Sequence, residues 1–481
     1  MARRAALALV VAAAVTVAGV SAYVFVYQPS ACGPYYNDAS KYVAQKTTFG
    51  GVTEYCLARP TRWSNAIVVG PDGSVWFGEE ALPGLGRLYQ NGTVVEYPWT
   101  FAETGSGISG WKTGIWSVVS WNGGIWATDG DGNMLVGLDP TSKSLTMVNS
   151  SSAPFPYVAT VAPGGSLWFT SLSSPPKLAM LSENLTLSVY RVAGTSEEEP
   201  IQVQFVNSTY AYMVALDPYS EQGEGGLYSF DPQATGGTIE ATRVGGNFTL
   251  FDPDGLALEG GSVWVTEHGP STVAGYDLED QEWTLYPTST VPYVDTTLPY
   301  FVDAAGGTVW FNEHYANKIA RFGPNQTTLT EFSEADPEVT NGSQVQNDLT
   351  IAADSQGVWF TSTTGNYIGF VNASYVPSFS ISGAHQLYLN PGAVQNVTFE
   401  VSGSWQTSLK VVASDSENFT GELSLIHVTP STTEIPAGNG PYALSAAFEA
   451  ADDLAPGRYT VAFTVTNGLV WQTSYVFVDV G

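Results

Sequence analysis

Strand-like hydrophobic segments repeat at a nearly constant interval along residues 51–374. Each repeat carries one aromatic anchor in a Gly-rich run, as in Gly-Ser-Val-Trp76-Phe and Gly-Thr-Val-Trp310-Phe. Successive anchors are 50, 42, 44, 52, 46 and 49 residues apart, for Trp76, Trp126, Trp168, Tyr212, Trp264, Trp310 and Trp359. A period of about 40 to 50 residues with turns between short apolar runs is typical of propeller blades. No useful amphipathic helical pattern competes with it. The chain is therefore predicted to be all-β, with a seven-bladed β-propeller over residues 51–375.

The fifth repeat shows how one blade is encoded. Its strand-forming runs are short, rich in Val, Trp, Tyr and Thr, and bounded by Gly, Pro or Asp. They predict strands over residues 254–259, 262–266, 273–277 and 282–286. Four such strands form one antiparallel sheet, whose apolar faces need neighbouring sheets to cover them.

The seventh repeat lacks a fourth strand, and the start of the chain supplies a matching one. Gly51–Leu57 has the same form as the outer strands Thr93–Tyr97 and Thr328–Phe332. We expect Gly51–Leu57 to be the outermost strand of the blade that contains Trp359. This pairing would close the ring and remove exposed sheet edges.

Residues 376–481 depart from the repeat and form a second predicted domain. About seven alternating strands within roughly 100 residues predict an immunoglobulin-like β-sandwich. The segments Leu389-Asn-Pro-Gly and Leu454-Ala-Pro-Gly resemble accessory sandwich domains of surface and carbohydrate-active proteins. A plain spacer or packing role for this domain is an open alternative.

Two stretches of the repeat, Gly70–Glu79 and Val309–Arg321, carry a recognisable family pattern. With the outer-strand Thr-Glu-Tyr, they resemble the streptogramin (virginiamycin B) lyase-like family of seven-bladed propellers over about residues 51–374. The resemblance implies the fold. It also implies, for that family, acidic and histidine residues on neighbouring blades that act with magnesium to open a cyclic depsipeptide by β-elimination. One propeller scaffold hosts many activities, so the fold alone does not fix the chemistry.

The N-terminal segment predicts export. Arg3 and Arg4 precede an uncharged run from Ala5 to Tyr27, which is long enough to cross a bilayer. We expect residues 1–30 to form a single-pass anchor with a cytoplasmic N-terminus, followed by a linker over residues 31–50. A secretory signal cleaved near Val20–Ala22 is the alternative. Either interpretation places the rest of the chain outside the cytoplasm.

The two cysteines and the sequons agree with export. Cys32 and Cys56 are the only cysteines, and in an oxidising compartment they predict one disulfide; two unpaired buried thiols are the alternative. Ten Asn-x-Ser/Thr sequons predict a glycosylated surface, at Asn91, Asn149, Asn184, Asn207, Asn247, Asn325, Asn341, Asn372, Asn396 and Asn418.

The charge balance limits the classes of molecule that the protein is expected to bind. The net charge of −29 comes from 45 acidic residues against only 16 Lys and Arg. Phosphate binding needs clusters of Lys and Arg, so nucleic acid is not expected as a partner. A scarcity of bases also suits an acidic habitat, where carboxylates become neutral and excess bases would repel one another.

Two Glu-His pairs are the candidate chemistry. Glu267-His268 and Glu313-His314 follow the second strands of adjacent repeats, where their side chains could meet at one rim of the propeller. We take all four residues as candidate catalytic residues, and His268, His314 and Glu313 as candidate ligands of a divalent cation such as magnesium. Successive strand residues point to opposite faces, however, so a Glu and the His beside it cannot both face the axis while the strand persists. Polar surface without a ligand, and a binding site without chemistry, are the alternatives.

These observations predict an extracytoplasmic, membrane-anchored propeller that binds a cell-surface protein or glycan. The alternative function is a metal-dependent lyase that eliminates across a C–O bond, or a hydrolase. A structural component of the cell envelope is the third possibility.

Overall fold

The described part of the protein is built almost entirely from β-strands. The computed structural model describes residues 32, 41–58, 64–79, 84–99, 114–195, 197–220, 223–234, 236–289, 296–334, 348–362, 365–415 and 425–481. Within these residues the one helical element is the short 3-10 helix η1 (Pro324–Gln326). The predicted all-β class is confirmed.

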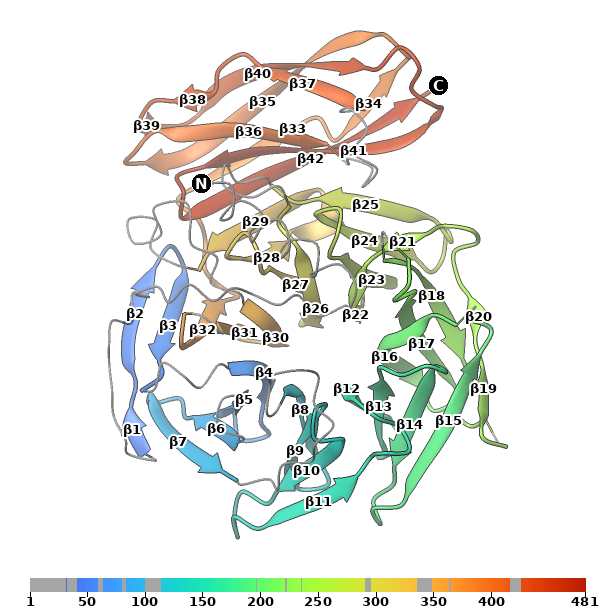
Figure 1. Cartoon of the computed structure of the whole chain (residues 1–481). Helices are drawn as coiled ribbons and strands as arrows, with labels where there is room; N and C mark the ends of the chain where they lie inside the picture. The colour runs from blue at the N-terminus through green and yellow to red at the C-terminus, as the bar shows by residue number, and fades with distance from the viewer. Residues whose placement is uncertain are drawn as a thin grey trace, which may run out of the picture.

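In the described part of the chain, seven four-stranded antiparallel units follow one another. Their first strands face the middle of the ring in Figure 1, and later strands lie progressively outward. In chain order the units are β4 (Ser64–Val69), β5 (Val75–Glu79), β6 (Gly84–Leu88), β7 (Thr93–Pro98); β8 (Ile115–Trp121), β9 (Gly124–Asp129), β10 (Met134–Leu138), β11 (Leu145–Asn149); β12 (Pro156–Val161), β13 (Leu167–Ser171), β14 (Lys177–Leu181), β15 (Leu187–Ala193); β16 (Glu199–Asn207), β17 (Tyr210–Leu216), β18 (Glu224–Phe230), β20 (Thr242–Arg243); β22 (Pro253–Glu259), β23 (Ser262–Glu267), β24 (Thr272–Asp277), β25 (Trp283–Pro287); β26 (Pro299–Ala305), β27 (Thr308–Glu313), β28 (Lys318–Phe322), β29 (Thr328–Ser333); and β30 (Asp348–Asp354), β31 (Gly357–Ser362), β32 (Tyr367–Asn372), β3 (Val52–Cys56). We number these units 1 to 7. Two short strands, β19 (Thr238–Glu240) and β21 (Leu250–Phe251), add to units 3 and 4.

The last unit takes its fourth strand from the beginning of the chain, as predicted, but this strand is not the outermost one of its sheet. β3 pairs antiparallel with β32, so that Thr53 lies opposite Phe370. β2 (Gln45–Phe49) adds outside β3, and β1 (Lys41–Val43) pairs with β7 of unit 1. Within the expected linker over 31–50, β1 and β2 thus pair with strands of units 1 and 7.

The repeated aromatic anchors supply the packing between units. Trp76 of β5 is buried against Ile115 and Val118 of the next unit. Trp264 of β23 is buried against Val302 and Phe311 in the same way. A twisted sheet cannot cover its own two faces, so each anchor needs a neighbouring unit to be buried.

The C-terminal residues form two packed sheets that lie against the ring (Figure 1). One sheet holds β34, β36, β38, β41 and β42, and the other holds β33, β35, β37, β39 and β40. Their bounds are β33 (Phe379–Gly383), β34 (Gln386–Leu389), β35 (Val394–Trp405), β36 (Leu409–Asp415), β37 (Ile426–Pro430), β38 (Glu434–Ile435), β39 (Gly438–Asn439), β40 (Tyr442–Ala450), β41 (Gly457–Thr466) and β42 (Val470–Val480).

The contact between the two parts of the molecule is a shared sheet. β42 pairs antiparallel with β29 of unit 6, and Thr330 lies opposite Gln472. The same strand continues beyond this contact and pairs with β34 and β41. The C-terminal domain is thus joined to the propeller by backbone hydrogen bonds, a feature that the sequence pattern did not predict.

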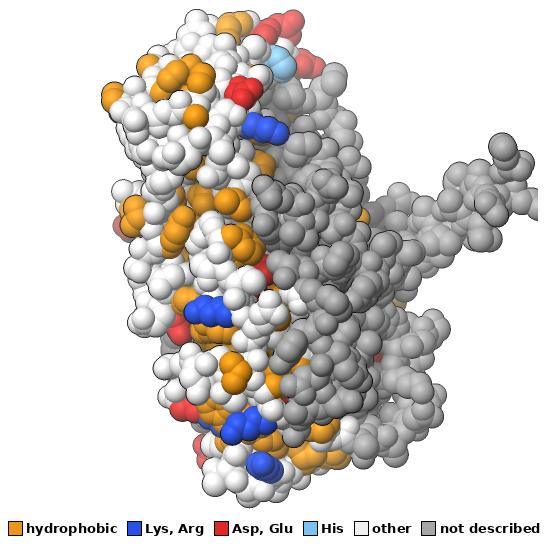
Figure 2. Space-filling model, turned by 90° about the vertical axis from the view of Figure 1, so that its left-hand side faces the viewer, with side chains coloured by type: hydrophobic (Ala, Val, Ile, Leu, Met, Phe, Trp, Pro, Cys, Tyr) orange, Lys and Arg blue, Asp and Glu red, His pale blue; other side chains and the backbone are white. Residues whose placement is uncertain are grey.

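Surface features match part of the sequence analysis. Cys32 and Cys56 form the predicted disulfide. The eight sequon asparagines within the described ranges are all exposed, whereas Asn341 and Asn418 lie outside those ranges. On the face shown in Figure 2, Lys and Arg side chains are few and do not merge into a basic patch.

The expected anchor, residues 1–30, lies outside the described part of the chain. Among the helices of the described residues, none is both long enough and apolar enough to span a membrane.

Candidate functional site

The two predicted histidines meet on one face of the ring. β23 ends at Glu267 and β27 ends at Glu313, so each histidine is the first residue beyond its strand. The backbone N–H of His268 donates to the carbonyl of Asp252, and that of His314 donates to the carbonyl of Leu298. Each histidine is thereby fixed to the entry of its own unit's first strand.

The imidazole rings of His268 and His314 are in direct contact. Their Nε2 atoms are 3.3 Å apart, and the ring planes are nearly perpendicular, at 81°. At this separation one Nε2 donates a proton and the other accepts it.

A carboxylate decides which nitrogen is the donor. Asp252 Oδ2 lies 3.0 Å from His268 Nδ1, and Asp254 Oδ2 lies 3.9 Å from the same atom. The carboxylate holds the proton on Nδ1 of neutral His268 and leaves its Nε2 as a lone pair. His314 then donates from Nε2, which gives a relay from Asp252 through His268 to His314.

The surroundings of His314 and Asp254 determine the protonation of these two side chains. His314 is almost fully buried, and its burial, followed by the nearby His268, lowers the pKa of His314 well below its usual range. Burial, followed by the charge of Asp252, raises the pKa of Asp254 well above its usual range. His314 is therefore neutral at physiological pH, which is the form that accepts a metal ion or exchanges a proton.

Aromatic side chains from other units extend the site across the ring. The ring of Tyr300 in unit 6 lies 5.2 Å from both histidine rings. Its hydroxyl is 2.6 Å from that of Tyr157 in unit 3, and Trp116 in unit 2 lies 5.4 Å from the Tyr157 ring. Residues from units 2, 3, 5 and 6 thus surround one central region.

The two glutamates do not join the histidines. Glu267 is buried and accepts hydrogen bonds from the backbone N–H of Phe251, at 3.0 Å, and from Thr272 Oγ1, at 2.7 Å. Burial raises the pKa of Glu267 to about 7. Glu267 is thus held by its own hydrogen bonds rather than by the histidines, because the last strand residue faces away from the residue that follows it. Its catalytic role stays a prediction.

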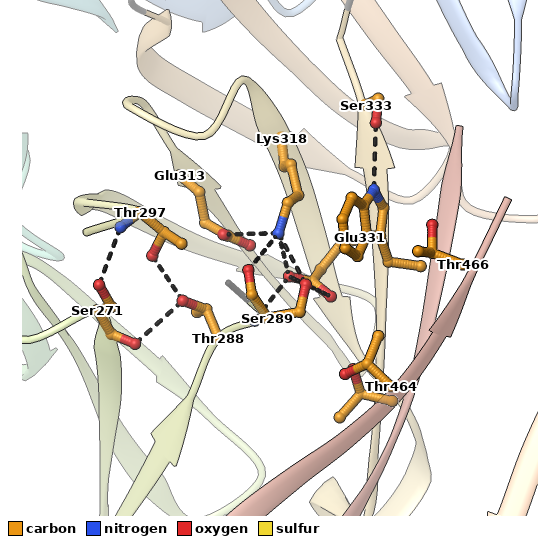
Figure 3. A network of polar contacts seen from close by, with 12 residues as sticks. Ser271, Thr288, Ser289, Thr297, Glu313, Lys318, Glu331, Ser333, Thr464 and Thr466 are labelled. Atoms are coloured by element: carbon orange, nitrogen blue, oxygen red, sulfur yellow. Dashed lines mark hydrogen bonds and ion pairs between the residues drawn. The ribbon is translucent and has the colours of Figure 1, made fainter. Parts of the chain in front are cut away.

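Glu313 belongs to a separate buried network (Figure 3). Lys318 Nζ lies 3.3 Å from Glu313 Oε2 and 2.8 Å from Glu331 Oε1, and it also donates to the carbonyl oxygen and hydroxyl of Ser289. The charge of Lys318 is thus neutralised within the protein interior, where unpaired charges are costly. The structure thus pairs Glu313 with Lys318, and the catalytic and metal-binding roles of Glu313 stay predictions.

Sequence reasoning missed Asp252, Asp254 and Tyr300. All three lie where a first strand enters its unit, on the same face as the ends of the second strands. Asp252 adopts a left-handed φ of +53°, which Asp tolerates better than most residues. The signal was the Asp-Pro-Asp at residues 252–254, at the start of the first strand of the unit that carries His268.

Two neighbouring positions fit a divalent cation. On one side of the His268 ring, Asp252, Asp254 and Nδ1 offer three ligand atoms within 4.8 Å of one another. On the other side, the Nε2 atoms of His268 and His314 are 3.3 Å apart, close to the roughly 3.4 Å between two ligands of a tetrahedral ion bound at about 2.1 Å. The first set suits magnesium, which prefers oxygen ligands, and the second suits zinc-like metals.

Comparison with known proteins agrees with the fold. No family model matches the chain, and no curated protein sequence matches it. A solved structure of an inactive variant of virginiamycin B lyase from Staphylococcus aureus with quinupristin is 16% identical, with a TM-score of 0.53, and covers 67% of this chain and 98% of its own. The chain has the propeller fold of the streptogramin B lyases.

Two further structures support that statement. A selenomethionine-substituted virginiamycin B lyase from the same organism is 18% identical, with a TM-score of 0.52, over 67% of this chain and 98% of its own. A streptogramin B lyase is 19% identical, with a TM-score of 0.51, over 67% of this chain and 97% of its own. The resemblance predicted from the Trp-Phe repeats is confirmed for the fold.

Proposed function

We propose that the protein is an exported β-propeller that binds its ligand at the His268–His314 pair and acts on it by acid–base chemistry, as a lyase or hydrolase. The observation that supports this proposal most directly is the 3.3 Å contact between the Nε2 atoms of His268 and His314. The carboxylate of Asp252 lies next to the other ring nitrogen of His268, Nδ1. A carboxylate-backed imidazole with a lone pair on Nε2 is a suitable general base. One solved structure with this fold is named a streptogramin B lyase, an enzyme of the first of these two reaction types.

A divalent cation fits this proposal. His268 and His314 would hold a zinc-like ion through Nε2, with Asp252 orienting His268 from behind. When bound, the ion would polarise a carbonyl or ester oxygen of the ligand. The protein itself would keep His314 neutral by burial and would orient His268 through Asp252. Tyr300 and Tyr157 would lie beside the bound ligand.

A binding protein without chemistry is the second candidate. It is favoured by the fact that the lone pair of His268 already faces His314. His268 must therefore break its contact with His314 before its Nε2 can accept a proton from a substrate. A cell-surface protein or glycan remains the expected ligand in that case.

We also infer the wider organisation. The seven units would be the blades of one ring over residues 51–375, and residues 376–481 an immunoglobulin-like sandwich. The Arg-led apolar run at the N-terminus supports an anchor over residues 1–30, and the disulfide supports an oxidising compartment outside the cytoplasm.

The first experiment is a calorimetric titration of zinc, manganese and magnesium into the full chain. Saturable binding that is lost in His314→Ala and retained in Asp254→Asn would place the ion between the two Nε2 atoms. The opposite pattern would place it on the Nδ1 side. Equal heats in the wild type and in both variants would exclude either metal site.

The second experiment tests catalysis. Quinupristin is incubated with the full chain, with His268→Ala and with Asp252→Asn, and the products are followed by mass spectrometry. A ring-opened product that both variants fail to form supports the lyase. Saturable binding that His268→Ala abolishes, without any product, would favour the second candidate. No binding and no product would reject quinupristin as a ligand.

A further inference from the structure

A cleft of about 600 Å³ lies where unit 5 meets the C-terminal domain, and its lining does not include the histidine pair. Its lining comes from the approach to unit 5, from β25, and from the ends of β41 and β42: Gly245, Asn247, Phe248, Glu282, Trp283, Thr284, Arg458 and Asp479. This volume is in the range of ligand sites in proteins, roughly 300 to 1,000 Å³.

The floor of the cleft is aromatic. The rings of Phe248 and Trp283 are stacked, with centroids 4.8 Å apart and planes 16° from parallel. Gly245 has a φ of +76°, and a Cβ at this position would lie 2.1 Å from Trp283 Nε1. The glycine is therefore required for the indole to occupy its place.

The wall of the cleft is polar and nearly balanced in charge. Arg458 donates through Nε to Asp479 Oδ1 at 3.0 Å, and Asp479 Oδ2 accepts from Gln386. Within the described residues Arg458 uses only its Nε for hydrogen bonding, which leaves its terminal amino groups available, and the exposed Glu282 lines the same cleft. Tyr388, which is 72% exposed, lies opposite Asp479 in the adjoining strand.

We propose that this cleft binds a saccharide. None of the described residues that line it has an aliphatic side chain, so a purely apolar ligand gains little there. A sugar ring has an apolar C–H face that packs on aromatic rings, and hydroxyl groups that bind carboxylates and guanidinium groups. Arg458 disfavours a cationic ligand, and the two carboxylates disfavour a phosphate.

Such a sugar can come from two sources. Asn247 belongs to the sequon Asn-Phe-Thr, lines the cleft and is exposed. A glycan attached to Asn247 would begin at the mouth of the cleft and would join the propeller to the C-terminal domain. A saccharide from outside the protein would use the same contacts.

The first arm of the test concerns the attached sugar. The full chain is purified from the cell that naturally makes it, and peptide mass mapping records glycosylation at Asn247. Asn247→Gln is compared with Asn184→Gln, which removes an equally exposed sequon in unit 3. If the attached glycan occupies the cleft, Asn247→Gln lowers Tm by about 2 °C or more beyond the control.

The second arm concerns a free sugar. N,N′-diacetylchitobiose and mannobiose are titrated into the full chain that carries Asn247→Gln. Binding that Arg458→Ala or Glu282→Gln weakens at least about tenfold supports an external saccharide. Arg191→Ala is the matched control, because Arg191 forms a similarly exposed pair with Glu197 and lies outside the cleft.

A positive result in either arm supports the proposal and identifies the source. The proposal is overturned if the two Asn variants melt alike and neither disaccharide binds at about 10 mM. It is also overturned if a Lys-rich peptide binds in place of the sugars, or if Arg191→Ala weakens binding as much as Arg458→Ala. His268→Ala should leave both arms unchanged, so this test is independent of the function proposed for the histidine pair.

Discussion

The ammonium group of Lys318 lies against the indole ring of Trp471, with Nζ 4.5 Å from the ring centroid. Lys318 belongs to unit 6 of the propeller, and Trp471 belongs to the last strand of the C-terminal domain. Trp471 also donates through Nε1 to Ser333 Oγ at 3.2 Å. The C-terminal domain therefore covers a buried charge of the propeller. Lys318 pairs with Glu313, the residue that precedes the catalytic candidate His314.

We predict that Trp471→Ala destabilises the whole protein, by about 3 to 5 kcal/mol, because it opens a cavity and uncovers the Lys318 network. Denaturant unfolding monitored by fluorescence measures the loss. Tyr388→Ala, which truncates an aromatic residue that is 72% exposed in the same domain, should change the unfolding free energy little. Equal effects of the two substitutions would show that the domain does not stabilise the propeller.

Removal of the N-terminal strands should open the ring. A variant that begins at Ala58 lacks β1, β2 and β3, leaves β32 as an exposed edge, and loses the segment whose strands pair with both unit 1 and unit 7. We expect a markedly lower Tm and concentration-dependent aggregation, since unpaired edges associate. Thermal melting and light scattering test this. A truncated protein that melts like the full chain would contradict the closure.

The disulfide should contribute measurably to stability. Cys32 and Cys56 are separated by 24 residues, and closing such a loop stabilises the folded state by about 3 kcal/mol in the chain-entropy model. We expect the Cys32→Ser/Cys56→Ser double variant to lose about this amount in denaturant unfolding. Thiol titration of the denatured, unreduced wild type should find no free thiol. Two titratable thiols would argue against an oxidising compartment.

Stability should increase in mild acid. Burial raises the pKa of Asp303 to about 6 from the ordinary 3.8, so folded Asp303 holds a proton that the unfolded chain has released. Asp303 contributes its full stabilisation below pH 3.8. This contribution, up to about 3 kcal/mol of the unfolding free energy, is lost as the pH rises through about 6. Asp303→Asn should therefore flatten the pH dependence of the unfolding free energy between pH 4 and 7.

The control for this prediction is Asp139, whose pKa is shifted in the opposite direction. Ser142 and the backbone at Thr141 lower the pKa of Asp139 by hydrogen bonding, so its contribution is lost as pH falls. Asp139→Asn should thus reduce stability at neutral pH and leave the acid side unchanged. If Asp303→Asn leaves the pH profile of the wild type intact, Asp303 is not the titrating group.

The repeat pattern by itself determined the class of fold. Short apolar runs bounded by Gly and Pro fix strands locally, and each buried anchor such as Trp264 requires a neighbouring sheet, so a ring follows from the spacing alone. Closure by residues 51–57 was also predictable, because a strand of the outer-strand type stood before the first repeat while the last repeat lacked one.

Only the tertiary structure decided which side chains meet. His268 and His314 were predictable as neighbours from their equivalent places in adjacent repeats. Their partner Asp252 was not, because the left-handed entry to β22 that aims it at His268 leaves no periodic signal. The pairing of β29 with β42 joins Thr330 to Gln472. Such a contact depends on two distant edges that meet after both domains have folded, and alternation along a single strand carries no information about its distant partner.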